Sequence, residues 1–371
     1  MNDPLALHVL TRSDLESGET YHRWARGEEL ALPTPQKRAM MLANPHSRGP
    51  DEPVQIIGTK GDRVIGRIDL IAGQLRAAGE RLPICWGSQF FVPEADRSTM
   101  MGPMLLMKTN QVHHTLGAHG PSQMASPLYA KLKWAEVPLQ RWVMLRKSRS
   151  VVRRYLGSGP LGGIARTGVD AALVFHRGYV GARRLSAAGG LSAERVERMP
   201  ESFDSLLAPA DDRARGERSA EWINWNLSHS FGGSEGRHER ALYLVKPRGS
   251  DDVLGYFLLK VKFYPLATHR GFPDLTLATL ADSRVFDRAR CSDEALTLLS
   301  FVAAGELGAD ALEVCDPPGV RAGFYKSLGF LPAGTMRLFF RAVAPSPLAD
   351  PRWKDPANWD IRFGDGENIA S

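Results

Sequence analysis

Apolar and polar residues follow one another in an order that predicts a series of strands and helices. A short apolar stretch at residues 6–12 precedes a polar helical stretch at 13–26. Residues 54–74 predict two strands joined by a turn at Lys60-Gly61-Asp62, and 84–92 predict a buried strand. The remaining elements expected in this half are a helix at 102–116, a short helix at 126–134 and a closing strand at 141–147.

The same order of elements returns after about residue 192. Gly66 and Tyr129 in the first half are 63 residues apart, and Gly255 and Tyr325 in the second are 70 residues apart. We interpret the halves as a tandem repeat, the alternative being chance similarity of two α/β segments. The expected elements are strands at 193–199, 274–282, 311–316 and 335–343, a hairpin at 241–264, and helices at 201–207, 220–231, 292–308 and 322–330.

The chain of 371 residues is long enough for two domains of ordinary size. We expect one domain at 1–147, a basic and Gly-rich linker at 148–191, and a second domain at 192–345. The linker has a Gly-rich loop at 157–168 and a helical stretch around 169–174. The tail at 346–371 is rich in Pro, Asp and Asn without a period, so we expect it to be extended over the surface or partly disordered.

Composition and charge narrow the class of protein. Three cysteines far apart exclude a disulfide scaffold, and no run approaches the ~18 apolar residues of a membrane span. The N-terminal residues lack a signal-peptide pattern, so we expect a soluble, cytoplasmic protein with no membrane partner. The formal net charge is +6, and one acid-free stretch holds six cations that match this excess: Arg141, Arg146, Lys147, Arg149, Arg153 and Arg154.

Three short segments of the first half, and one of the second, carry a resemblance to a known family. The second-half segment, 324–330 (FYKSLGF), matches a Y-x-x-L-G-F ending. Together with the element order over 6–145 and 193–343, these segments resemble the GNAT superfamily of acyl-CoA N-acyltransferases. The resemblance implies an α/β (α+β) fold of two GNAT-like domains, each a mixed, mainly antiparallel central sheet flanked by helices. The first-half segments are 90–94 (FFVPE), 97–102 (RSTMMG) and 128–134 (LYAKLKW).

The resemblance implies a pyrophosphate loop with the pattern R/Q-x-x-G-x-G/A, whose backbone N–H groups meet the phosphates at a helix N-terminus. Arg97 and Gly102 fit this pattern, whereas Ser98 and Met100 stand where glycines are common, and Pro103 removes one N–H group. An ordinary strand-to-helix turn is the alternative. The resemblance implies acetyl-CoA as the donor, held by Phe91, Val92, Arg97, Ser98, Thr99, Met100, Met101 and Gly102.

The second half has no such loop. Residues 283–290 contain no glycine before the next helix, and their three arginines are typical of a solvated face. We therefore expect the second half to be a degenerate copy that shapes the acceptor pocket or the interface.

Acyl transfer to an amine needs a base, an oxyanion donor and an acid for the departing thiolate. In the family, an N–H at the end of the strand before the loop meets the oxyanion, which points to Phe91 or Val92. The resemblance makes Tyr129 the candidate general acid, and Glu94 follows the strand as the candidate base. The alternatives are a packed Tyr129 and an exposed, ion-paired Glu94. No metal is expected, because His113, His114 and His119 lack the spacing of helical ligands.

The leading hypothesis is an acetyl-CoA-dependent N-acyltransferase that acts on an amine of a small molecule or sugar. A Fem-like aminoacyl-tRNA-dependent transferase is the alternative, since such ligases pair two GNAT-like domains without needing the CoA loop. A non-catalytic binding protein with the same fold is a third hypothesis. The stretch Arg141–Arg154 either docks on acidic surface of the other half or binds an anionic acceptor or nucleic acid such as tRNA.

Overall fold

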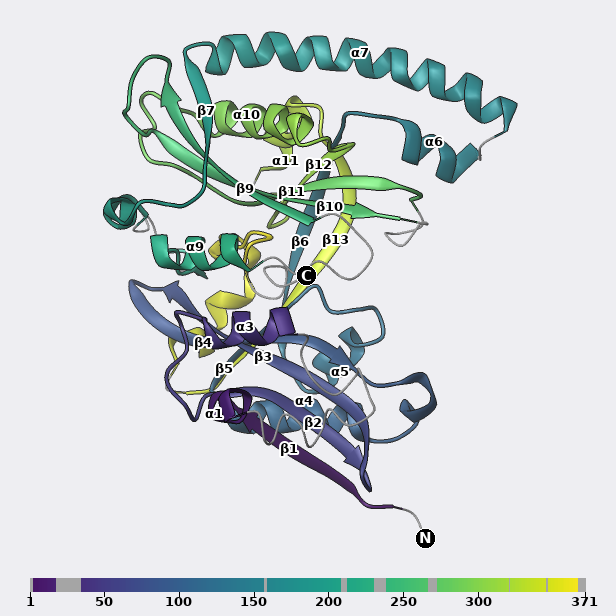
Figure 1. The fold of residues 1–371 in the computed structure, drawn as a ribbon, viewed down its shortest axis with the longest axis vertical. Helices are drawn as coiled ribbons and strands as arrows, with labels where there is room; N and C mark the ends of the chain where they lie inside the picture. Colours follow the sequence, from purple (N-terminus) through teal and green to yellow (C-terminus); the bar gives the residue numbers. More distant parts are fainter. Residues whose placement is uncertain are drawn as a thin grey trace.

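The computed structural model describes residues 3–17, 35–156, 159–207, 212–229, 238–265, 272–319, 321–344 and 346–365. Its first half lies at the bottom of Figure 1 and its second half at the top. The elements of the first half are β1 (Leu5–Thr11), α1 (Arg12–Ser17), α3 (Pro35–Leu42), β2 (Pro53–Lys60), β3 (Arg63–Ala77), β4 (Glu80–Phe91), the 3₁₀ turn η1 (Glu94–Asp96), α4 (Met101–Val112), β5 (Thr115–His119), α5 (Ser126–Lys131) and β6 (Ala135–Leu145).

Two helices, α6 (Arg149–Leu156) and α7 (Pro160–Ala188), join this half to the second. The second half contains β7 (Leu191–Val196), η2 (Glu201–Phe203), α8 (Asp204–Leu207), β8 (Arg215–Gly216), α9 (Ala220–Ser228), β9 (His238–Pro247), β10 (Gly255–Tyr264), β11 (Leu275–Val285), α10 (Asp293–Glu306), β12 (Ala311–Asp316), α11 (Ala322–Ser327) and β13 (Leu331–Ala342). The 3₁₀ turns η3 (Pro347–Ala349), η4 (Pro351–Lys354) and η5 (Pro356–Asn358) follow.

The described strands form one 13-stranded sheet in the order β1-β2-β3-β4-β5-β13-β6-β12-β11-β10-β9-β7, with the short β8 beside β3. This order has the same pattern of pairing from either end. Counting inward, β4 and β5 pair in parallel, as do β11 and β12, and the other neighbours on this path are antiparallel. The sheet therefore has an internal pseudo-two-fold relationship, which agrees with the tandem repeat expected from the sequence.

The two halves exchange their closing strands at the centre of the sheet. β13 lies between β5 and β6 of the first half, and β6 lies between β13 and β12 of the second. Figure 1 shows these two long strands running from one half to the other. Each half thus has its own helices and sheet portion, as expected for two mixed, mainly antiparallel domains, but the two portions are continuous.

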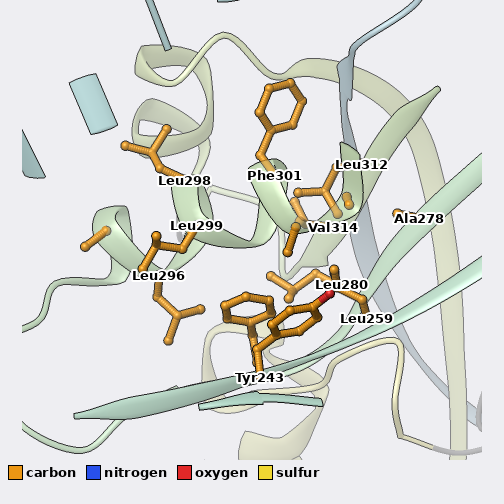
Figure 2. Packing of buried hydrophobic residues seen from close by; sticks show 14 of the residues in the cluster. Tyr243, Leu259, Ala278, Leu280, Leu296, Leu298, Leu299, Phe301, Leu312 and Val314 are labelled. Carbon is orange, nitrogen blue, oxygen red and sulfur yellow. The ribbon is translucent and has the colours of Figure 1, made fainter. Parts of the chain in front are cut away.

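The core of the second half forms where α10 packs on one face of the sheet. Ser292 begins this helix by accepting a hydrogen bond of 3.0 Å from the backbone N–H of Ala295. Figure 2 shows apolar side chains of α10 packed against those of the strands. Burial of each such side chain contributes about 1.5–3 kcal/mol. The labelled residues are Leu296, Leu298, Leu299 and Phe301 from α10, and Tyr243, Leu259, Ala278, Leu280, Leu312 and Val314 from the strands.

The Gly-rich segment was wrongly expected to be a loop from Pro160 onward. Pro160 lies in the first turn of α7, where its missing N–H costs no helical hydrogen bond, and the helix continues for 29 residues. α7 packs against α10 and α6, and this tertiary packing supports the helix despite the low helix propensity of its glycines. Among the described residues, no helix has both the length and the apolar character needed to span a membrane.

The tail was expected to be extended over the surface or partly disordered, but Leu348, Trp353, Trp359 and Ile361 of its described part, residues 346–365, are buried in the core. Three 3₁₀ turns lead Trp353 and Trp359 into an apolar cluster that also contains residues of α3 and α9, including Met40 and Trp225. Asp350 and Asp355 cap two of these turns by accepting backbone hydrogen bonds from Arg352 and Ala357. The absence of a period in the sequence therefore reflects short turns rather than disorder.

Candidate functional site

The two parallel strands of the first half diverge shortly after they meet. β4 and β5 pair at Cys85↔Leu116 and Trp86↔Gly117. β4 then continues to Phe91, while the end of β5 pairs with β13 through His119↔Leu338. The gap between them opens at the carboxyl ends of parallel strands, which is a common location for ligand sites in α/β proteins.

β4 has a bulge within this diverging portion. Asp69 on β3 faces Ser88, and Arg67 faces Phe91, so two residues of β4 oppose one residue of β3. Gln89 in this bulge has a φ of 46°, which is unusual for a residue other than glycine. A bulge redirects backbone groups and commonly lies next to a functional site. The bulge could not be predicted from the sequence, because no glycine marks the position.

The candidate phosphate loop leads from η1 to the first turn of α4. Asp96 is buried and accepts two hydrogen bonds, of 2.9 and 2.7 Å, from the guanidinium of Arg63. These hydrogen bonds lower the pKa of Asp96. The carbonyl of Asp96 accepts a 2.6 Å bond from the Thr99 hydroxyl, and the Thr99 oxygen accepts a 3.3 Å bond from the N–H of Met101. The loop is thus fixed at both ends.

Glycines in the neighbouring strands allow the first turn of α4 to approach the sheet closely. A Cβ atom at Gly66 would lie 2.9 Å from side-chain atoms of both Met101 and Leu105. A Cβ atom at Gly58 would overlap Met101. Larger residues at these two positions would push α4 outward, so the glycines determine where its N-terminus lies.

The loop, the end of β4 and α5 meet at Gly102. A Cβ atom built there would lie 3.6 Å from Leu128 and from Phe90, and 3.9 Å from Val92. The structure therefore brings together the segments that the sequence singled out. Arg97 is exposed, and its Nε donates a 3.3 Å hydrogen bond to the carbonyl of Val92.

Three other predicted site residues lie on the exposed side of this loop. Glu94 is exposed within η1, and Ser98 is exposed in the turn that follows it. Met100, at a position where glycine is common, is 62% exposed and ends the turn before α4. Its side chain therefore extends beside the helix N-terminus rather than into the core.

Tyr129 is buried at the divergence of β4 and β5. Its ring packs with its centroid 5.3 Å from that of Phe339 on β13, and its edge contact with Trp134 spans 4.9 Å. Its hydroxyl oxygen lies 3.9 Å from the position a Cβ would take at Gly87. Gly87 is the first β4 residue beyond the parallel pairs, so the hydroxyl lies at the opening of the gap.

A buried ion pair that the sequence analysis missed lies on the opposite face of β3 and β4. Nζ of Lys37, on α3, is 2.6 Å from Oδ2 of Asp69 and 3.2 Å from Oγ of Ser88. Nε2 of Gln55 donates to the other Asp69 oxygen at 2.7 Å. Lys37 and Asp69 are almost fully buried, so removing one partner would leave an uncompensated charge. In the sequence, the charged Asp69 within the apolar stretch 64–72 could have indicated this ion pair.

The corresponding gap in the second half is filled by the chain itself. β11 and β12 pair in parallel only as far as Thr279↔Glu313. Beyond that point, the backbone N–H of Gly364 donates a 2.6 Å hydrogen bond to the carbonyl of Ala281. Asp365 packs against β5 through a 2.8 Å hydrogen bond from Nδ1 of His119. The tail therefore lies beside the ends of β11 and β12, at the position that corresponds to the divergence of β4 and β5 in the first half.

Tyr325, which corresponds to Tyr129, forms a hydrogen bond to a carboxylate. Its hydroxyl donates to Oδ2 of Asp316, and Nη1 of Arg362 from the tail lies 3.1 Å from Oδ1. Burial raises the pKa of Tyr325. This half also has no glycine loop before α10, so it is a degenerate copy of the first.

The basic stretch is divided among several contacts with the second half. Arg141 forms a buried ion pair with Glu313, and Nζ of Lys147 lies 3.1 Å from Asp310. Nη1 of Arg146 donates a 2.9 Å hydrogen bond to the carbonyl of Phe301, and its guanidinium lies over the Phe301 ring. Arg153 pairs with Asp274 at 2.6 Å. Much of this charge is thus neutralised along the seam between the halves, as expected for a linker docked on the other half.

Histidines 113 and 119 are buried rather than arranged around a common point. Burial lowers the pKa of both His113 and His119 to about 4. The described part of the chain contains no group of three or more His, Cys, Asp or Glu side chains that could hold a metal ion.

Comparison with known proteins places this architecture among acyltransferase folds. No protein-family model and no curated protein matches the chain. Among solved structures, Saccharomyces cerevisiae N-myristoyltransferase with bound myristoyl-CoA has a TM-score of 0.54 at 12% identity, covering 97% of this chain and 85% of its own. A GCN5-related N-acetyltransferase from Anabaena variabilis has a TM-score of 0.51 at 11% identity, covering 91% and 72%. The chain therefore has the GNAT fold, present as two halves of which the second is degenerate.

Proposed function

We propose that the protein is an acyl-CoA-dependent N-acyltransferase whose donor binds in the first half. The observation that carries this proposal is the meeting of three features at one place: the gap between β4 and β5, the bulge in β4, and the hydroxyl of Tyr129 at the opening of the gap. The GNAT fold supports the same reaction class.

The residues of the loop fit the pyrophosphate of CoA. α4 is 12 residues long, and its dipole favours an anion at its N-terminus. Gly102, with its backbone N–H, lies in the first turn of α4, and the exposed Arg97 adds a positive charge beside it. Met101 contributes less, since its N–H already bonds to Thr99, and Pro103 has none. Phe91 and Val92 lie at the end of β4, where the pantetheine would pass.

The reaction requires the acceptor nitrogen to attack the thioester carbonyl, forming a C–N bond while the C–S bond breaks. In this proposal the N–H groups of Phe91 or Val92 stabilise the oxyanion. Tyr129 donates its proton to the departing thiolate. Glu94, exposed in η1, removes the proton of the attacking amine through water. Acetyl-CoA is the proposed donor, and an amine on a small molecule or sugar is the proposed acceptor.

Titration calorimetry with CoA and acetyl-CoA tests the donor site. We expect one molecule of CoA to bind per chain. At a ligand concentration of 100 times the dissociation constant, binding should raise the free energy of unfolding by about 2.7 kcal/mol. Arg97→Ala should weaken binding, whereas Arg288→Ala, an exposed arginine in the corresponding loop of the second half, should not. Absence of binding by any acyl-CoA from acetyl to myristoyl contradicts the proposal. Release of CoA in the presence of a panel of amines then tests the transfer itself.

A further inference from the structure

The outer side of α7 is exposed along most of its length. Figure 1 shows this helix along the upper edge of the molecule, with α10 beneath it. Val180 and Ala188 point inward, since both are buried in the core cluster that contains residues of α10. On the other side, Ile164 is 73% exposed, Phe175 81% and Leu185 67%. Exposed apolar side chains gathered on one face are typical of a protein–protein or membrane contact.

Seven exposed residues on this side of α7 form an uncharged line with heptad spacing. Alternating steps of four and three residues keep a line on one face of a helix, as in coiled coils. Gly168 and Gly178 have open space around them, because a Cβ atom at either would have no described atom within 4 Å beyond its own part of the helix. We call this line the α7 seam, and its residues are Ile164, Gly168, Ala171, Phe175, Gly178, Ala182 and Leu185.

From Gly168 to Leu185 the spacing of the seam is the same in both directions. Its steps are 3, 4, 3, 4 and 3 residues, so a second copy of α7 running antiparallel places its six residues opposite these six. In that pairing Phe175 lies opposite the partner's Gly178, and Leu185 lies opposite the partner's Gly168. Each bulky side chain therefore meets a glycine, and the remaining pairs join two alanines. A two-fold contact between identical chains requires such self-complementarity.

The seam is also free of charge along both of its edges. The positions that flank it, which often hold charged residues in coiled coils, are here alanine, glycine, serine, threonine, valine and tyrosine. The arginines of α7 lie on its other faces. Among them, Arg183 lies 2.6 Å from Glu294 of α10, and Arg166 lies 3.5 Å from Asp170 of α7 itself. Two copies of this basic helix can therefore meet along the seam without placing like charges opposite each other.

The composition of the seam favours a second copy of the chain over a lipid surface. A helix that lies on a membrane inserts a face of bulky apolar side chains such as Phe and Leu. In the α7 seam such side chains are separated by glycine and alanine. These small residues add little to insertion into lipid, but they allow a second helix to approach closely.

The size of the seam indicates a reversible contact. Between Gly168 and Leu185 it is about 26 Å long and about 10 Å wide, from the rise and diameter of a helix. The surface buried by two such strips is smaller than the roughly 1,200–2,000 Å² of stable interfaces. We therefore expect the chains to be separate in dilute solution and to associate as their concentration rises.

We propose that two copies of this chain associate reversibly through the α7 seam, with their α7 helices antiparallel. The two-fold axis passes between Phe175 and Gly178, and the bulky side chains of each copy fill the space above the glycines of the other. This inference is independent of the proposed transferase function, because α7 packs on the second half and the proposed donor site lies in the first.

Sedimentation velocity at increasing protein concentration tests the association. We expect the mass of the wild type to rise from that of one chain toward that of two. Phe175→Asp should remain monomeric throughout, because it removes a bulky side chain and places a carboxylate in the seam. Arg177→Asp is the matched control, since Arg177 is exposed on another face of α7, and it should associate like the wild type. A wild type that stays monomeric, or a Phe175→Asp variant that associates equally well, overturns the inference.

Vesicles of anionic phospholipid test the alternative partner. Wild-type protein that stays monomeric but sediments with these vesicles, and loses this binding in Phe175→Asp, would assign the seam to a lipid surface and overturn the inference. Circular dichroism of each variant verifies that it is folded, which the 81% exposure of Phe175 leads us to expect.

Disulfide crosslinking tests the antiparallel register. Ala171 lies opposite the partner's Ala182, so Ala171→Cys/Ala182→Cys should form a disulfide-linked dimer on mild oxidation. The two positions are about 16 Å apart on one helix, which prevents a bond within the chain. The native cysteines are buried and should not compete. We expect neither single variant to crosslink by itself. Single variants that crosslink as well as the double variant, or a double variant that does not crosslink, overturn the proposed pairing.

Discussion

The ring of Tyr129 on α5 stacks on Phe339 of β13, with centroids 5.3 Å apart and planes inclined by 23°. The first residue belongs to the first half of the chain and the second to the last strand of the second half. The candidate acid is therefore held by a strand that the other half supplies. Chemistry assigned to one half depends on the folding of both.

The two related tyrosines are expected to respond differently to loss of the hydroxyl. Tyr129→Phe should reduce turnover about 100-fold and leave CoA affinity unchanged, because only proton transfer to the thiolate is removed. The measurement is steady-state transfer together with calorimetric binding. Unchanged turnover would mean that Tyr129 only packs in the core and does not donate the proton.

Tyr325→Phe provides the matched variant. It removes a buried hydrogen bond to Asp316, which retains its pair with Arg362. We expect the free energy of unfolding to fall by about 1.5–3 kcal/mol and turnover per folded molecule to stay within twofold. Urea unfolding measures the change in the free energy of unfolding. A large loss of turnover without loss of stability would contradict the assignment of the active centre to the first half.

The exchanged strands predict that the halves cannot fold separately. A fragment of residues 1–147 lacks β13, which lies between β5 and β6 in the sheet. We expect this fragment to be insoluble or to lack CoA binding, and co-expression with residues 148–371 to restore both solubility and binding. Size-exclusion chromatography and calorimetry check the outcome. A soluble fragment 1–147 that binds CoA by itself would show that β13 is dispensable.

Local patterns explain what could be predicted from the sequence. Alternation of apolar residues, turn residues such as Gly61 and the helical period are local features, so most of the element order and the repeat are readable from them. The helix expected at 102–116 was wrong at its end, because α4 ends at Val112 and β5 follows. The pairing of β13 with β5 joins residues more than two hundred positions apart, and no local pattern encodes it. The same holds for the bulge at Gln89, where the backbone is fixed by its neighbours rather than by a glycine.

The tail shows a second limit of structure prediction from the sequence. Its prolines begin 3₁₀ turns that the sequence analysis did not expect, because its composition alone suggests an exposed or disordered segment. The tail is instead anchored by three apolar side chains that are fully or almost fully buried: Trp353, Trp359 and Ile361. The candidate loop residues could be named from a resemblance, whereas the exchange of β6 and β13 joins strands from both halves and required the fold.

The burial of the tail predicts a large cost for truncating one of its aromatic side chains. Trp359 is fully buried, its indole N–H donates a 2.7 Å hydrogen bond to the carbonyl of Trp353, and its ring centroid is 4.9 Å from that of Phe340. Trp359→Ala should reduce the free energy of unfolding by about 3–5 kcal/mol. Phe175→Ala, on the outer face of α7 with 81% exposure, should change it by less than about 0.5 kcal/mol. Equal effects of the two variants in urea unfolding would contradict the core position of the tail.

The histidine at the end of β5 predicts a dependence of stability on pH. Burial lowers the pKa of His119 to about 4, only partly offset by its hydrogen bond to the Asp365 carbonyl, while its pKa in the unfolded chain is about 6.5. Between these values the unfolded state binds more protons than the folded state. The contribution of His119 is therefore complete above about pH 6.5 and is lost as the pH falls toward about 4.

One such histidine adds at most about 1.4 kcal/mol per pH unit to the slope of the free energy of unfolding against pH. His119→Asn should keep a donor near the position of Nδ1 while removing the titrating ring. We expect the free energy of unfolding of this variant to fall less steeply than that of the wild type between pH 6.5 and 4. The measurement is the urea midpoint across this range, with His114→Asn at the neighbouring exposed position as the control. Parallel pH profiles for the wild type and His119→Asn would mean that His119 is protonated in the folded protein over the same range as in the unfolded chain.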